Sequence, residues 1–182
     1  MNGTPPNIGS AVKKARRKLG LSLDETARLT GVSKAMLGQI ERGESSPTVS
    51  TLWKISTGLR LTFSALLDSA STTYAPSSLE AMRPMREENG AMLLYNVFPF
   101  EPAAGFEIFT IKLMPGCRYH SPSHVNVAEE YIIVAEGGLE LTVGRQVFVL
   151  TKGMTIKFKG DEQHAYANPY QETVVFQNII RY

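Results

Sequence analysis

The sequence predicts an α + β protein of two domains, one built from short helices and the other from short strands. Up to about residue 68, apolar residues recur at helical spacing, and capping residues stand before them. After Gly90, short runs rich in Val, Ile, Phe, Tyr and Leu are separated by glycine or proline. We therefore expect a helical domain over 1–68, a Ser-, Thr- and Pro-rich linker over 69–90 and a strand domain over 91–182.

Five short helices are expected in the first domain, and local signals mark the first two. Residues 8–19 form the first, with one apolar side and one side that carries Lys and Arg. The second follows Ser22, which fits a capping box with Glu25 three residues later. The box predicts where this helix begins, because each side chain accepts a hydrogen bond from the other residue's free backbone amide.

The third helix carries the most informative motif of the chain. Ser33 can cap it, and Gly43 can end it in the left-handed conformation. Its apolar residues lie on one face and leave the other face free, as a helix that enters the major groove of DNA requires. Apolar positions within 49–55 and 63–67 indicate a fourth and a fifth helix.

The caps, the turn and the trailing E-R-G-E-S-S-P run together resemble the helix-turn-helix domain of the phage repressor and Cro family, over residues 8–68. The resemblance implies double-stranded DNA as a partner. It also implies which residues contact DNA: Lys34, Ala35 and Gln39 read bases, while Ser33 and Arg42 bind phosphate. One departure is Leu23, which stands where many relatives place a phosphate-binding glutamine.

Charge and cysteine content support this division. Residues 1–68 hold ten Lys and Arg against five Asp and Glu, whereas 69–182 hold nine against twelve. A basic domain joined to an acidic one is typical of a nucleic-acid-binding module fused to another domain. Cys117 is the single cysteine, so no intrachain disulfide can form, which favours the cytoplasm. We expect neither a secretion signal nor a membrane span.

The second domain is expected to consist of short strands separated by turns. Seven strands are predicted, over 92–98, 106–113, 131–135, 139–143, 146–150, 155–158 and 173–179. Regularly spaced short strands of this kind favour a sandwich or a barrel.

The three histidines, His120, His124 and His164, all lie among these strands. Their surroundings, residues 115–137 and 152–168, resemble the paired motifs of the cupin fold, a double-stranded β-helix or jelly-roll barrel. The resemblance implies that His124, Glu130 and His164 bind a divalent transition metal. Histidine and carboxylate are common ligands of zinc, iron, manganese and nickel.

One position departs from the first cupin motif, because Pro122 stands where the first histidine is expected. Residues two apart on an extended strand face the same way, so His120 could point into the barrel and replace that ligand. Glu129 is an alternative carboxylate to Glu130. Histidines in a barrel can also be ordinary hydrogen-bonded core residues, and that alternative stays open.

Taken whole, the chain resembles bacterial transcriptional regulators with a repressor-type helix-turn-helix and a cupin sensor. The M-L-G-Q-I-E-R-G run is similar to members linked to sulfur utilisation. Two recognition helices are needed to contact successive major grooves, so we expect a homodimer. The effector is expected to be a small molecule, such as an amino acid or a sulfur compound.

Four aromatic residues are candidates to contact that effector, judged by strand position and aromatic character: Tyr95, Phe109, Tyr131 and Phe176. Ordinary barrel core is the alternative for each. Two other functions remain open at this point. The cupin could be a metal-dependent enzyme of dioxygenase or isomerase type fused to a DNA-binding domain, or a metal-free barrel used only for dimerisation.

Overall fold

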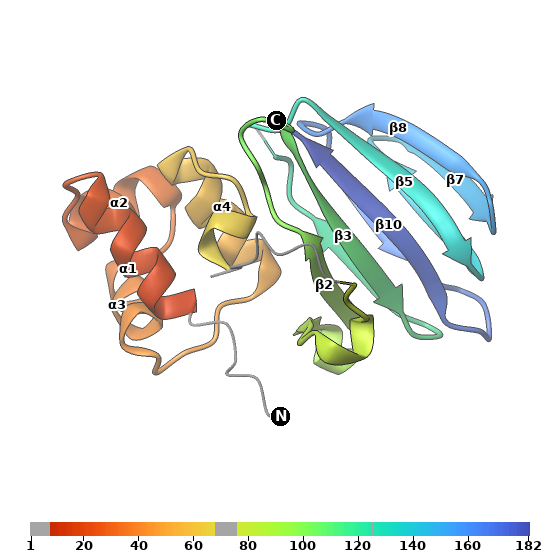
Figure 1. Cartoon of the computed structure of the whole chain (residues 1–182), viewed down its shortest axis with the longest axis horizontal. Helices are drawn as coiled ribbons and strands as arrows, with labels where there is room; N and C mark the ends of the chain where they lie inside the picture. Colours follow the sequence, from red (N-terminus) through yellow and green to blue (C-terminus); the bar gives the residue numbers. More distant parts are fainter. Residues whose placement is uncertain (1–7, 68–75, 125) are drawn as a thin grey trace. The chain divides into compact units, whose positions relative to one another are not determined.

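The computed structural model describes residues 8–67, 76–124 and 126–182, which fall into two compact units (Figure 1). The helical unit ends at Pro76, and the strand unit begins at Ser77. Within the described ranges, no helix is both long enough and apolar enough to cross a membrane.

The described part of the first unit contains four α-helices and one turn of 3-10 helix. They are α1 (Ile8–Lys18), α2 (Leu23–Thr30), α3 (Lys34–Arg42), α4 (Val49–Leu59) and η1 (Ser64–Leu66). The prediction of a fifth α-helix is therefore wrong, since only η1 forms where it was expected. No side chain caps η1, and a run this short makes too few hydrogen bonds to offset the cost of starting an α-helix.

Local sequence sets the limits of the two central helices. The hydroxyl of Ser22 accepts from the Glu25 amide at 3.2 Å, and the Glu25 carboxylate accepts from the Ser22 amide at 2.8 Å. Ser33 accepts from the Met36 amide at 3.2 Å. Gly43 ends α3 at a φ of 72°. The predicted capping box, cap and left-handed terminus are thus confirmed.

Helix α1 holds α3 in place by close approach and by an ion pair. A Cβ atom on Gly9 would lie 2.2 Å from the carbonyl oxygen of Ile40, so only glycine fits at this crossing. Arg16 Nε lies 2.6 Å from Glu41 Oε1, and the two side chains are only 13% and 6% exposed. The backbone of α3 is therefore fixed on the side that faces away from solvent.

Helix α4 packs against α2 in a similar way. A Cβ atom on Gly58 would lie 2.6 Å from the carbonyl oxygen of Leu29. Trp53 of α4 is buried, and its ring centroid lies 4.6 Å from that of Phe63. Trp53 is therefore a core residue, as expected from its place on the apolar stripe.

The described part of the second unit consists of two antiparallel sheets, ordered β1-β2-β3-β10-β5-β8 and β4-β9-β6-β7. The strands are β1 (Met85–Glu87), β2 (Met92–Phe98), β3 (Phe106–Leu113), β4 (Arg118–Ser121), β5 (Glu129–Glu136), β6 (Gly138–Val143), β7 (Gln146–Thr151), β8 (Thr155–Lys159), β9 (His164–Ala167) and β10 (Val174–Arg181). Figure 1 shows β3, β10 and β5 side by side, although they are far apart in the sequence. All seven predicted strands are present, and β1, β4 and β9 are additional.

Part of the segment expected to be a linker is ordered against the first sheet. Strand β1 pairs with β2, with Arg86 opposite Leu93. Two 3-10 turns, η2 (Leu79–Ala81) and η3 (Glu88–Gly90), flank β1. The remainder of that segment, 68–75, lies outside the described residues.

The inner faces of the two sheets form the core of this unit. Along β3, buried Phe109, Ile111 and Leu113 alternate with less buried neighbours. Along β6, buried Leu139 and Leu141 alternate in the same way. Directly opposite residues of antiparallel strands face the same side of the sheet. A residue that pairs with one of these buried positions therefore faces inward, and its neighbours along the strand face outward.

Candidate functional sites

Helix α3 presents its predicted DNA-contacting residues to solvent. The exposed set is Ser33, Lys34, Ala35, Gln39 and Arg42. On the other side, Leu37 and Ile40 are buried. Met36 is also exposed, at 43%, which places one apolar side chain among the polar ones. The helix therefore has a free face that can meet a partner while its opposite face anchors it.

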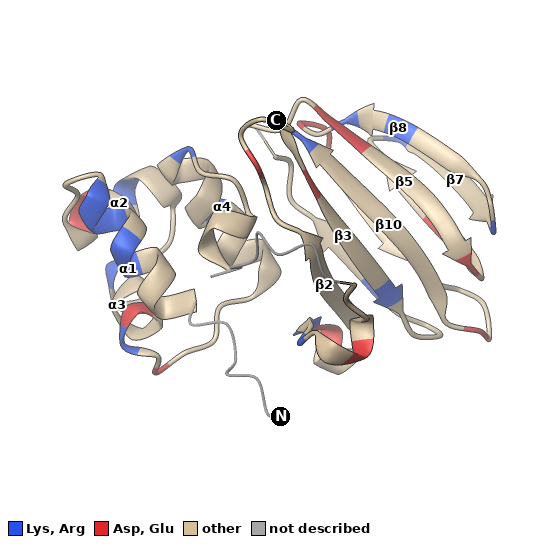
Figure 2. Cartoon of the chain, in the orientation of Figure 1, with Lys and Arg blue, Asp and Glu red and all other residues tan. Residues whose placement is uncertain are grey.

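Positive charge extends beyond α3 within the same unit, as Figure 2 shows by the Lys and Arg on α1 and α2. The last turn of α1 contains Arg16, Arg17 and Lys18. Arg16 forms an ion pair with Glu41, whereas Arg17 and Lys18 are exposed. Exposed cations of this kind attract the phosphate backbone of DNA without reading its sequence.

Two of the predicted DNA-contacting cations form ion pairs at the surface. Lys34 Nζ lies 2.8 Å from Asp24 Oδ2, which belongs to the first turn of α2. Arg42 donates through Nε and Nη2 to the two carboxylate oxygens of Glu44, both at 2.7 Å. Neither partner was foreseen. The first pair depends on how α2 and α3 cross, which the sequence does not give.

Inside the second unit, His124, Glu130 and His164 form a buried cluster. One ligand atom from each lies within 4.8 Å of the others. Glu130 Oε1 is 3.7 Å from the Nε2 atom of each histidine. Ligands about 2.1 Å from a tetrahedral zinc ion lie about 3.4 Å apart, so the two carboxylate-to-imidazole distances are about 0.3 Å longer than in such a site.

The cluster is assembled from three separate parts of the chain. Glu130 is near the start of β5 and faces inward opposite Phe158, and His164 begins β9. His124 lies in the loop after β4, where its amide donates to the carbonyl of Gly160 at 2.8 Å. A Cβ atom on Gly160 would lie 2.3 Å from Val127 Cγ1, so glycine allows the two loops to meet.

Hydrogen bonds from surrounding residues orient His164 and Glu130. His164 Nδ1 lies 3.0 Å from the carbonyl oxygen of Glu162, which can only accept, so Nδ1 carries the proton. His164 Nε2 is then left with its lone pair. Glu130 Oε2 accepts from Asn178 at 2.9 Å and from the Tyr166 hydroxyl at 3.4 Å.

Two ligand atoms of the cluster are left without hydrogen-bond partners among the described residues. These two buried atoms are Glu130 Oε1 and His164 Nε2. Leaving a carboxylate oxygen and an imidazole nitrogen unsatisfied away from water is costly, and a metal ion would satisfy both. The donor set and its orientation therefore fit a metal.

Burial also sets the protonation of the cluster. It lowers the pKa of His124 well below the ordinary value, and the nearby His164 lowers it further. Burial raises the pKa of Glu130, an effect that His164, Asn178 and Tyr166 oppose. His124 is therefore neutral near pH 7, which is the form that binds metal.

The structure corrects the expectation that His120 replaces the missing ligand. Strand β4 ends at Ser121 because Pro122 has no N–H to continue the ladder. His120 is exposed and pairs with Ala165 on the outer face, so it does not join the cluster. Sequence reasoning missed Ser121, which is buried and lies 3.2 Å from His124 Nε2.

The direction in which each side chain points also decides between Glu129 and Glu130. Glu129 points outward, where it pairs with Lys157 at 3.0 Å and with Arg181 at 2.9 Å. The hydrogen bond from the Tyr131 hydroxyl, together with those from Lys157 and Arg181, lowers the pKa of Glu129 to about 2. Glu130, the next residue, therefore supplies the inward-facing carboxylate.

The four aromatic candidates divide between the two faces of the larger sheet. Phe109 and Phe176 are fully buried on the inner face. Tyr95 is buried, at 8% exposed, but it lies opposite Thr110, the neighbour of Phe109, so it faces outward. Tyr131 also faces outward and donates to Glu129. The expectation that Tyr95 and Tyr131 line the interior is therefore wrong, because it was made without knowing which residues of each strand face in.

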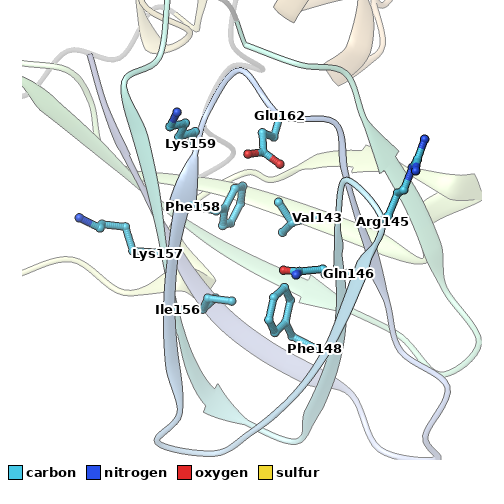
Figure 3. Close-up of a pocket in the computed structure, with 9 residues that line it drawn as sticks. All are labelled: Val143, Arg145, Gln146, Phe148, Ile156, Lys157, Phe158, Lys159 and Glu162. Atoms are coloured by element: carbon cyan, nitrogen blue, oxygen red, sulfur yellow. The ribbon is translucent and has the colours of Figure 1, made fainter.

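A cavity of about 490 Å³ lies next to the cluster, between β7 and β8. It is lined by Val143, Arg145, Gln146, Phe148, Ile156, Lys157, Phe158, Lys159 and Glu162. In Figure 3 the rings of Phe148 and Phe158 turn into this space, whereas Lys157 and Arg145 point outward. The Phe158 ring centroid is 5.1 Å from that of His164. Phe158 therefore lies between the cavity and one of the metal-ligand candidates.

Known proteins match both units. A helix-turn-helix family matches residues 12–66, and a cupin domain family matches 109–180. The HTH-type transcriptional regulator SutR of Escherichia coli is 39% identical over 175 residues, or 96% of this chain and 94% of SutR. The crystal structure of an HTH_3 family transcriptional regulator from Vibrio cholerae superposes with a TM-score of 0.81 at 41% identity, covering 97% and 96% of the two chains.

A shorter match concerns the first unit alone. The HTH-type transcriptional regulator SinR of Bacillus subtilis is 35% identical over 75 residues, which is 41% of this chain and 68% of SinR. These relatives are named as transcriptional regulators, and none of these names indicates an enzyme. The two predicted domain types are confirmed. The chain thus belongs to the family of DNA-binding transcriptional regulators that join an amino-terminal helix-turn-helix domain to a carboxy-terminal cupin domain.

Proposed function

We propose that the cupin domain of this regulator binds a divalent transition metal and a small organic effector, and that the effector alters DNA binding by a homodimer. The observation that carries the proposal is the buried cluster of His124, Glu130 and His164, in which two ligand atoms have no hydrogen-bond partner among the described residues. Such a cluster is costly to maintain unless it binds something.

Zinc, iron, manganese and nickel all accept two imidazoles and a carboxylate. Three protein ligands leave coordination positions open, and when bound the metal would supply a positively charged anchor for a carboxylate or a thiolate. The His164–Glu162 hydrogen bond holds the imidazole in the metal-binding tautomer. Asn178 and Tyr166 hold the Glu130 carboxylate in place from its other oxygen.

The cavity between β7 and β8 suits a small anionic effector. Arg145 and Lys159 form no ion pair with any described residue, whereas Lys157 is committed to Glu129. These two cations lie at the rim of the cavity, outside the apolar wall of Phe148, and favour a ligand whose anionic end stays at the rim and whose apolar body enters (Figure 3). An amino acid or an organic sulfur acid has this chemistry.

Within the core, Phe109 and Phe176 are the two remaining aromatic candidates for effector contacts. The ring centroid of Phe176 lies 5.2 Å from that of Tyr166, whose hydroxyl reaches Glu130. A movement of Glu130 can therefore displace Phe176 through the ring of Tyr166. Phe158, which contacts both His164 and the cavity, is the more direct contact.

For DNA, we propose the contacts that the family resemblance implies. Lys34, Ala35 and Gln39 would read bases, and Ser33 and Arg42 would bind phosphate, in support of which all five are exposed on or beside α3. A homodimer in the cytoplasm would place two such helices on a near-palindromic site. The effector must bind one dimer arrangement more tightly than the other, since otherwise it shifts nothing.

Metal analysis with native mass spectrometry of the full chain tests the cluster. We expect one metal per chain in the wild type, and loss of it in a His124→Ala/His164→Ala variant. His120→Ala is the matched control, because it removes an exposed histidine outside the cluster and should keep the metal. Absence of metal from wild-type protein exposed to each of the four ions, or equal metal in the double variant, would overturn the proposal.

The DNA contacts are tested on duplexes that the wild type selects from a random-sequence pool. Lys34→Ala or Gln39→Ala should relax base preference, whereas Arg42→Ala should weaken binding to all sequences and lower the salt slope by about 1. Unchanged binding in all three variants would reject this assignment of α3.

The effector class is tested by measuring affinity for the same duplex in the presence of single amino acids and of their uncharged amides. Only the free acids should change the affinity, and an Arg145→Gln/Lys159→Gln variant should lose the response. A response to the amides that equals the response to the acids would contradict an anionic effector.

A further inference from the structure

We propose that Asp24 and Glu44 weaken DNA binding, because their carboxylates hold Lys34 and Arg42 in ion pairs that DNA must break. The inference rests on the proposed DNA contacts of Lys34 and Arg42. Each pair must be broken whether the cation meets a base or a phosphate, so the cost falls on binding to preferred and to random sequences alike.

The first pair joins the beginnings of the two helices of the motif. Asp24 lies in the first turn of α2, and Lys34 is the first residue of α3. The side chains are 70% and 60% exposed, so the pair lies in solvent, where DNA could reach it. Any phosphate or base that takes the Lys34 ammonium group would come close to the Asp24 carboxylate, which repels it.

The second pair has the stronger geometry. Arg42 offers two N–H groups to the two oxygens of Glu44 in a fork, with both distances at 2.7 Å. Such bidentate pairs are among the strongest hydrogen bonds between side chains. The hydrogen bond from Arg42 also holds the pKa of Glu44 below its ordinary value, so this carboxylate is ionised at neutral pH. At 58% and 53% exposure, this pair is also open to solvent.

These pairs change the number of ions that DNA binding releases. A free lysine or arginine that contacts phosphate contributes about 0.9 to the slope of log K against log salt. When the cation leaves a carboxylate to do so, the carboxylate takes up a salt cation, which cancels much of that contribution. Removing the carboxylate should therefore tighten DNA binding and also make it more sensitive to salt.

The test measures affinity of the full chain for a duplex selected by the wild type and for a scrambled duplex of equal length, between about 50 and 200 mM salt. In Asp24→Asn and Glu44→Gln, we expect affinity for the scrambled duplex to rise about threefold to fivefold, the size of an exposed ion pair. The salt slope should steepen by up to about 0.9 for each variant. Affinity for the selected duplex should rise by a similar factor, since the same pairs are broken there.

Glu25→Gln is the matched control for loss of one negative charge. Glu25 is adjacent to Asp24 and equally part of the first turn of α2, but it bonds to the Ser22 cap rather than to a cation. Glutamine preserves the capping box, so helix α2 should remain intact. A change in Asp24→Asn no larger than that in Glu25→Gln would overturn the role of the Asp24–Lys34 pair.

A second comparison separates the pair from general charge effects. In a Lys34→Ala background, Asp24→Asn should have no effect beyond that of Glu25→Gln, because the partner is gone. An undiminished effect in that background would overturn the inference while leaving the DNA contacts standing. If Lys34→Ala itself leaves DNA binding unchanged, the contact assignment fails first, and this inference fails with it.

Discussion

Replacing Gly58 with alanine tests how closely α2 and α4 pack in the DNA-binding domain. A Cβ atom at this position would lie 2.6 Å from the Leu29 carbonyl oxygen and 2.7 Å from the Thr30 Cα atom. Ordinary contacts begin near 3.4 Å, so the two helices would have to separate by about 0.8 Å. Both nearest atoms are backbone, and no side chain can turn away to relieve the clash.

Two opposing terms decide the size of the effect. Alanine inside α4 favours the helix by about 1 kcal/mol relative to glycine. Forced separation of packed elements costs about 1–3 kcal/mol, and the backbone contacts place Gly58 at the upper end. We therefore expect Gly58→Ala to lower the free energy of unfolding of this domain by about 2 kcal/mol.

Trp53 provides the assay, because it is the single tryptophan of the chain and is buried against Phe63. Its fluorescence during urea unfolding reports on the helical domain without interference from the cupin domain. The matched control is Gly38→Ala in α3, where the added Cβ would meet only the flexible end of Arg42, at 3.1 Å. That variant should be more stable by up to about 1 kcal/mol. Equal stability of Gly58→Ala and wild type, or shifts of the same sign in both variants, would refute the packing argument.

Three further predictions concern charge and burial. Glu41→Ala should destabilise the helical domain by about 2 kcal/mol in the same assay, since it leaves Arg16 nearly buried without its partner; a loss under about 0.5 kcal/mol would contradict this. The hydrogen bonds from Ser22 lower the pKa of Glu25, so the stability that Glu25 adds should be present above pH 4.5 and vanish as the pH falls through the lowered pKa. The check compares the free energy of unfolding of Glu25→Ala with that of wild type across this pH range. A stability difference that grows as the pH falls would contradict the prediction. Burial raises the pKa of Cys117, so its reaction with a thiol reagent at pH 8 should be slower in the native protein than in urea, and equal rates would argue against burial.

The helical domain could be predicted in most of its detail because its signals are local. The capping box of Ser22 and the cap at Ser33 act within three residues, and both are present as expected. The apolar stripe of α3 repeats within one helical turn. Only the fifth helix failed, where the apolar residues were present but a cap was not.

The strand domain was less predictable because strand limits depend on distant pairing. Strand β9 was missed since it lies between β4 and β6 with all four residues buried, so no alternating pattern marks it. The failure at β4 had a consequence for the site. Treating 120–124 as one extended strand placed His120 inside, whereas the strand ends at Ser121 and leaves His120 outside.

The sequence by itself determined the two domain types, the free face of α3 and the identity of His124, Glu130 and His164 as candidate ligands. Only the tertiary structure decided that Glu130 faces inward and Glu129 outward, and that Tyr95 and Tyr131 lie on the outer face. It also decided that Asp24 meets Lys34, and that a cavity opens beside His164. The physical reason is that caps and periodicity act over a few residues. The face that a strand residue points to is instead set by register with partners tens of residues away.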